Sequence, residues 1–214
     1  LERDQAGALL GPGTAARYAE MAEGLSVQYR GFLEHLKTLD VGNRYLEVGS
    51  GPGVLTVAVA RKNPDALFTG LEMSPDMVTV ATEVVGRAGL ANKIRFVAGD
   101  AGDRSAFASL GQFDLIYSTF SLHHWTDPRG VVQNLMSALA DGGVGLIISG
   151  HAYVSPEGQA GPWQLGLYKD ELVEGLASMC DAVHQAGGKI VVQLAHAGHF
   201  AAKALTGQAP HVVS

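Results

Sequence analysis

Residues 45–53 read Tyr-Leu-Glu-Val-Gly-Ser-Gly-Pro-Gly, an apolar run that ends in a carboxylate and passes directly into three alternating glycines. Gly49, Gly51 and Gly53 lack the Cβ atoms that block close approach, and they permit positive φ angles. The amides that follow open a predicted helix, whose first N–H groups have no partner inside it. The pattern therefore predicts a loop that lets a ligand touch backbone, although the same glycines also suit an ordinary tight turn.

Two later strand-like runs favour the ligand-binding interpretation. Residues 66–71 lead into Glu72, about twenty residues beyond the loop, where nucleotide-binding sheets carry an acid that accepts hydrogen bonds from ribose hydroxyls. Residues 94–98 lead similarly to Asp100. Three successive predicted strands thus end close to a carboxylate. The alternative is that Glu72 and Asp100 are solvated acids at strand ends.

The alternation of apolar runs and helical patterns predicts an α/β fold with a doubly wound, mostly parallel sheet and right-handed crossovers. Helical periodicity over residues 14–39 predicts N-terminal helices before the sheet. The expected strands cover residues 44–48, 67–71, 94–98, 113–118 and 141–148, and the expected helices cover residues 53–62, 75–88, 105–110 and 129–139.

Four segments, residues 47–53, 71–75, 99–101 and 113–117, resemble class I S-adenosylmethionine-dependent methyltransferases in order and spacing. The resemblance covers about residues 40–140 and implies a Rossmann-like sheet. The glycines follow an acid as G-x-G-x-G, as in that family. The dinucleotide fingerprint is G-x-G-x-x-G, and Thr56 occupies the place of its third glycine. The spacing favours S-adenosylmethionine over NAD.

The resemblance implies a cofactor site along one edge of the sheet. A carboxylate accepts hydrogen bonds from ribose hydroxyls or an exocyclic amine, and an apolar side chain covers an adenine ring. The implied residues are Glu47, Gly49, Gly51 and Gly53 beside the methionine part, Glu72 on the ribose, Met73 on the adenine face, Asp100 and the Ala101 amide on the adenine edge, and Ser118 after the fourth strand.

Residues 118–128 form a polar and aromatic loop where a methyl acceptor would lie. By the same resemblance His123 or His124 would orient or deprotonate the acceptor. The alternative is that one histidine caps the next helix while the other packs with Trp125. Methyl transfer depends mainly on alignment, so the sequence does not establish whether a general base is needed. The expected function is S-adenosylmethionine-dependent methyl transfer to a small molecule that the sequence does not identify.

From about residue 140 the chain instead resembles the old yellow enzyme family of flavin oxidoreductases, in residues 142–158, 164–168, 181–189 and 193–198. That family is a (β/α)8 barrel that binds FMN and typically needs about 250 residues. By resemblance Gln193 would contact the flavin, but other parts of the flavin site have no counterpart, so we do not expect this chain to bind FMN. The alternative function is a fusion or truncated fragment of an FMN-dependent NAD(P)H oxidoreductase.

The two resemblances predict a methyltransferase domain over residues 1–150 and a partial flavin-oxidoreductase-like segment over residues 151–214. We expect them to form one continuous α/β body. In it, a helix over residues 169–186 and a strand over residues 189–194 form an extra β-α-β unit that adds a parallel strand at the sheet edge. Residues 156–162 are expected to form a Gly/Pro-rich loop, and the chain after residue 195 to be weakly anchored.

Composition is that of a soluble globular protein: 214 residues, 47% apolar, 17% charged, net charge −6. Scattered cations disfavour nucleic acid as the partner, and apolar runs are too short to span a membrane. Cys180 is the only cysteine, and its helical neighbours predict a buried side chain. No metal site is expected, because the histidines lack suitably spaced carboxylates or thiols. We expect a cytoplasmic protein, with self-association through exposed strand edges left open.

Overall fold

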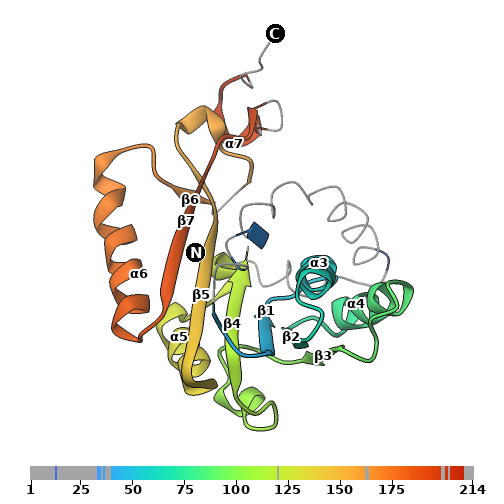
Figure 1. Cartoon of the computed structure of the whole chain (residues 1–214). Coiled ribbons are helices and arrows are strands. Elements are labelled where there is room, and N and C mark those ends of the chain that lie inside the picture. The colour runs from blue at the N-terminus through green and yellow to red at the C-terminus, as the bar shows by residue number, and fades with distance from the viewer. Residues whose placement is uncertain are drawn as a thin grey trace.

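The computed structural model describes residues 13, 33, 34, 36, 40–119, 121–161, 164–198, 201 and 203–209. Within these residues seven strands form one sheet in which every pairing is parallel, in the order β3-β2-β1-β4-β5-β6, with β7 also paired to β5 (Figure 1). The predicted parallel α/β sheet is confirmed. The strands are β1 (Arg44–Val48), β2 (Leu67–Glu72), β3 (Ile94–Ala98), β4 (Phe113–Thr119), β5 (Leu139–Tyr153), β6 (Leu165–Gly166) and β7 (Lys189–Ala195).

Helices cover both faces of the sheet, so the sheet is doubly wound (Figure 1). Helices α3 (Val54–Lys62) and α4 (Pro75–Arg87) pack on one face, and α5 (Pro128–Ser137) and α6 (Val173–Gln185) pack on the other. The shorter helices are η3 (Arg104–Phe107), η4 (Leu122–His124), η5 (Pro156–Gly158), η6 (Asp170–Leu172) and α7 (Lys203–Thr206).

Some predicted helices differ from the observed ones. The segment expected to be helical over residues 105–110 is the 3-10 turn η3, and residues 169–186 begin with η6 before the α-helix starts at Val173. The N-terminal helices predicted over residues 14–39 lie almost wholly outside the described residues. Cys180 on α6 is only partly buried, because α6 buries a single residue, Val183, completely.

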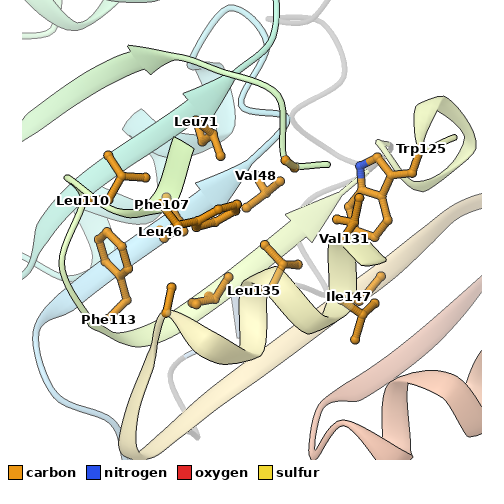
Figure 2. Packing of buried hydrophobic residues seen from close by; sticks show 14 of the residues in the cluster. Leu46, Val48, Leu71, Phe107, Leu110, Phe113, Trp125, Val131, Leu135 and Ile147 are labelled. Carbon is orange, nitrogen blue, oxygen red and sulfur yellow. The ribbon is translucent and has the colours of Figure 1, made fainter. Parts of the chain in front are cut away.

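The core lies on both sides of the central strands. Leu46 and Leu115 are fully buried, on opposite sides of the sheet. Figure 2 shows part of the layer between the sheet and α5, where Trp125 of the loop after β4 lies beside Val131 of α5. This packing anchors the loop that follows β4, so the segment containing η4 has a fixed place at the end of the sheet.

Strand β5 joins the two parts of the chain. Its first part pairs with β4 as far as Ile148, and its last residues pair with β6 and β7. The register shifts between Ile148 and His151, where Gly150 has a φ of 82°. Figure 1 shows β5 continuing beyond the end of β4. The predicted parallel docking of the last strand is confirmed, and residue 150, the proposed domain boundary, falls within β5.

Candidate functional site

The strand order reverses between β1 and β4, which lie side by side with β2 and β5 on their outer sides. The loops after β1 and β4 therefore leave the sheet on opposite faces from adjacent points, which opens a crevice at their carboxyl ends. Ligands of doubly wound sheets bind in such a crevice. The glycine loop after β1 and η4 after β4 both lie at this point.

All three glycines of the loop adopt positive φ angles, of 70° at Gly49, 51° at Gly51 and 75° at Gly53. Gly49 is also tightly enclosed, because a Cβ there would lie 2.4 Å from Cβ of Ser121. A Cβ on Gly53 would lie 2.7 Å from the ring of Phe96. Gly51 differs, because no atom of the described residues lies within 4 Å of its Cβ position. The loop is thus packed at both ends and open in the middle.

Glu72 joins the glycine loop to the next strand end. Its carboxylate accepts a hydrogen bond from the Gly51 amide at 2.9 Å and another from the Ser74 amide at 3.0 Å. The side chain is partly buried, and Met73 beside it is 39% exposed. A carboxylate has about four lone-pair sites, so two amides leave it able to accept from a ligand. Glu72 and Met73 therefore present an acceptor and an apolar side chain beside the open glycine.

Asp100 and Ala101 follow β3 at the same end of the sheet, where the strands have their carboxyl ends. The Gly99 amide donates to the Glu72 carbonyl at 2.9 Å, which ties this turn to the end of β2. Asp100 is exposed, and its Oδ1 accepts from the Gly102 amide at 2.8 Å. The Ala101 carbonyl accepts from the side-chain amide of Asn134 at 3.0 Å. The structure thus brings the predicted ends of β1, β2 and β3 together.

Glu47 lies below the glycine loop in the interior and is only 2% exposed. Its Oε2 accepts hydrogen bonds from the hydroxyls of Thr56, at 2.6 Å, and Tyr117, at 3.1 Å. Burial is the main cause that raises the pKa of Glu47 to about 8, and nearby Glu72 also raises it, although the two hydroxyls act in the opposite direction. The carboxyl group is therefore mostly protonated near neutral pH.

Sequence reasoning missed the roles of Thr56 and Tyr117. Thr56 was noted only as a departure from a glycine pattern, yet it is fully buried on α3 against Glu47. Tyr117 is the direct partner of Glu47 in the pairing of β1 with β4. A signal was available for Tyr117, because Glu47 lies one position before the end of β1 and Tyr117 lies two positions before the end of β4.

Ser118 and Ser121 fasten the loop after β4 to β1. Both hydroxyls donate to the Val48 carbonyl, at 3.0 Å and 3.3 Å. Both side chains are buried. Ser118 therefore joins the end of β4 to the end of β1 at the base of the crevice. Its hydroxyl donates its hydrogen to the Val48 carbonyl in this structure.

Of the two predicted acceptor-side histidines, only His124 has a described side chain; that of His123 lies outside the described part. His124 is exposed at the end of η4. Desolvation lowers its pKa below the usual value, while the nearby Glu72 carboxylate acts to raise it. His124 is thus within electrostatic reach of the predicted ribose acid, and its lowered pKa favours the neutral form that a proton acceptor needs.

The second part of the chain presents different polar groups at the end of β5. The Ser149 hydroxyl is buried and accepts from the Gln193 amide of β7 at 3.2 Å. His151 pairs with Gln193 across the strands, and partial burial lowers the pKa of His151. Among the described residues no group of three or more His, Cys, Asp or Glu side chains is arranged to hold a metal ion. No helix in the described part is long and apolar enough to cross a membrane.

Comparison with protein families finds two matches. The methyltransferase domain model matches residues 46–144, and the model of the NADH:flavin oxidoreductase / NADH oxidase family matches residues 121–212. Both resemblances predicted from the sequence are confirmed. The matches overlap over residues 121–144, which include η4 and α5 and extend into β5.

Individual relatives show the same division. The ubiquinone biosynthesis O-methyltransferase of Psychrobacter arcticus is 30% identical over 114 residues, which are 52% of this chain and 43% of that protein. The NADPH dehydrogenase of Bacillus subtilis is 45% identical over 62 residues, which are 29% of this chain and 18% of that protein. The chain thus spans less than half the length of the curated relatives it matches.

Among solved structures, a putative S-adenosyl-L-methionine-dependent methyltransferase from Methanococcus maripaludis is similar with a TM-score of 0.58. The two are 22% identical, and the likeness covers 81% of this chain and 71% of the other. At this identity the likeness shows the fold. The chain has the Rossmann-like fold of methyltransferases, extended by the β5-α6-β7 unit.

Proposed function

We propose that the crevice at the carboxyl ends of β1, β2 and β4 binds S-adenosylmethionine and that the protein transfers its methyl group to a small-molecule acceptor. The observation that carries the proposal is the contact between Glu72 and the Gly51 amide, which places a partly buried carboxylate beside the one loop glycine with open space above it. The methyltransferase match over residues 46–144 supports the same assignment.

The residues present fit this cofactor. The open face of Gly51 admits a ligand, Glu72 has acceptor capacity left for ribose hydroxyls, and Met73 offers an apolar surface. Asp100 and the Ala101 amide would meet the adenine edge, and Glu47 with the glycine loop would lie toward the methionine part. Ser118 would act by holding the Val48 carbonyl, and thereby the loop.

When bound, the cofactor supplies a sulfonium methyl group that is already a strong electrophile. The work left to the protein is to hold the acceptor in line and to exclude water. Neutral His124, and His123 beside it in the chain, would orient an acceptor hydroxyl or amine, or remove its proton. The acceptor itself is not identified.

Calorimetric titration with S-adenosylhomocysteine tests the proposal. We expect micromolar binding by the wild type and loss of binding in Glu72→Ala and Gly51→Val. Glu83→Ala removes an exposed acid from α4, and Gly89→Val imposes the same left-handed strain in open space at the far end of α4, so both controls should bind normally. A folded wild type that does not bind would refute the proposal.

A second candidate function is as part of a longer FMN-dependent NAD(P)H oxidoreductase. The match over residues 121–212 and the parallel β5-α6-β7 unit favour it. Gln193, partly buried on β7, is the side chain that would meet the flavin. Quenching of FMN fluorescence by the wild type but not by Gln193→Ala would support this function, and no quenching would exclude it for this chain.

A further inference from the structure

Glu47 is a buried acid, and none of the described residues gives it a positive partner. It forms no ion pair with a cationic side chain in the described part of the chain, and the hydroxyls of Thr56 and Tyr117 both donate to Oε2. No described residue donates a hydrogen bond to Oε1. Burying a carboxylate in this way is costly, so the group takes up a proton instead.

The surroundings of Glu47 on each side agree with a neutral carboxyl group. From β4 it faces the phenol of Tyr117, which is itself buried, and from α3 it faces the uncharged hydroxyl of Thr56. The charged group that acts on it from β2 is the Glu72 carboxylate, whose like charge opposes ionisation. A cation arriving from the crevice would reverse this balance, because an opposite charge nearby favours the ionised form.

We propose that Glu47 is protonated in the ligand-free protein and releases its proton to solvent when a ligand places an ammonium group at this end of the crevice, with Thr56 and Tyr117 as the positioning residues. The inference rests on the proposed function and adds to it that cofactor binding is coupled to the loss of a proton. The carboxylate that remains is balanced by the ligand's ammonium group, so the pair adds no net charge to the interior.

The expected size of the effect follows from the titration of Glu47. With a pKa of about 8, the carboxyl group is mostly protonated near pH 7, so binding should release about one proton there. Release should diminish as the pH rises past about 8, because the group is then already ionised.

The test is calorimetric titration near neutral pH in phosphate and in Tris, whose ionisation enthalpies differ, so that the difference in binding enthalpy counts the protons released. Two nucleosides serve as probes: S-adenosylhomocysteine carries the ammonium group, and 5′-methylthioadenosine lacks it. We expect about one proton for the first and none for the second. Glu47→Gln, which keeps an oxygen acceptor for both hydroxyls, should still bind but release none.

Tyr117→Phe tests whether the Tyr117 hydroxyl acts on the titration of Glu47 or only contributes to packing. Removing a donor to the ionised carboxylate raises the pKa of Glu47 further, so proton release should persist to higher pH than in the wild type. Infrared spectra of the ligand-free wild type and of ligand-free Glu47→Gln provide a test that needs no ligand. A band of a protonated carboxyl group should be present in the wild type and absent in Glu47→Gln.

Binding of S-adenosylhomocysteine without proton release, or release undiminished in Glu47→Gln, would overturn this inference and leave the proposed function standing. Failure of the folded wild type to bind S-adenosylhomocysteine would overturn both.

Discussion

Strands β1 and β2 and strand β7 are covered very differently. In β1 every residue after Arg44 is buried, and in β2 the four residues between Leu67 and Glu72 are buried. Helix α3 buries five residues against them. In β7 no residue is fully buried, and α6 buries only Val183. All-parallel sheets are normally covered on both faces. The part that matches methyltransferases therefore has a completed core, whereas the part that matches flavin oxidoreductases has the strand pairing of a parallel sheet without its usual cover.

The functional groups follow the same division. Around β1 and β2 they are joined by hydrogen bonds into one site, with Glu72 linked to Gly51 and Glu47 linked to Tyr117. At β7, the hydrogen bond from the Gln193 amide to the Ser149 hydroxyl fixes the backbone at the register shift. The first part therefore holds all the residues of the proposed cofactor site.

The largest expected effect tests the difference in burial. Leu46→Ala in β1 removes a side chain with no exposed surface and should lower the free energy of unfolding by about 2–5 kcal/mol. Leu194→Ala in β7, where the side chain is 61% exposed, should change it by no more than about 0.5 kcal/mol. Urea denaturation measures both. A loss at Leu194 equal to that at Leu46 would mean that β7 is covered in solution, for example by a second copy of the chain.

The next effect depends on pH and has opposite signs in the two parts. The folded-state pKa of Glu47 is raised to about 8, so its contribution to stability is complete below about pH 4.5 and is lost as the pH rises through 8. The loss should be on the order of 5 kcal/mol. The pKa of His151 is lowered, so its contribution is present above about pH 6.5 and is lost as the pH falls.

Denaturation across pH in matched variants separates these contributions. Glu47→Gln should flatten the decline in the free energy of unfolding as the pH rises from about 4.5 to about 8. His151→Gln should reduce the decline in the free energy of unfolding as the pH falls below about 6.5. An alkaline decline that is unchanged in Glu47→Gln would contradict a protonated carboxyl group at this position.

The sequence predicted the first part well because local and tertiary signals agree there. Residues 44–48 and 94–98 were placed with the observed bounds, and the glycine spacing correctly marked the three positive φ angles. The contacts of Glu47 were not predicted, because Thr56 and Tyr117 reach it only after β1 pairs with β4 and α3 packs on the sheet.

The second part was predicted less completely. Helical periodicity over residues 169–186 did not distinguish the 3-10 turn η6 from the helix that follows. The length of β5 was also underestimated, since the glycines within it indicate a strand end, whereas pairing with β7 carries the strand on to Tyr153. Tertiary pairing overrides local propensity at such positions.

A smaller effect compares two glycines of the same loop. Gly49→Ala should cost about 2 kcal/mol or more, because it combines left-handed strain with a Cβ placed 2.4 Å from Ser121. Gly51→Ala carries the strain alone, about 1–2 kcal/mol, because its surroundings are open. Thermal unfolding would rank the two, and equal losses would show that Ser121 moves aside and that the loops after β1 and β4 are not rigidly joined.

The smallest effect lies at the amino-terminal ends of the strands, where Arg44 begins β1 and Asp114 lies near the start of β4. The Asp114 carboxylate accepts from the Arg44 guanidinium at 2.9 Å and from the Arg44 amide at 2.9 Å, and this lowers the pKa of Asp114. Because the Arg44 side chain is 50% exposed, Asp114→Asn should cost no more than about 1 kcal/mol. Added salt should shrink the difference from the wild type, as measured by urea denaturation, since exposed charges are screened. A cost of several kcal/mol that salt does not reduce would mean that this pair, rather than the apolar packing around Leu46, holds the first part of the sheet together.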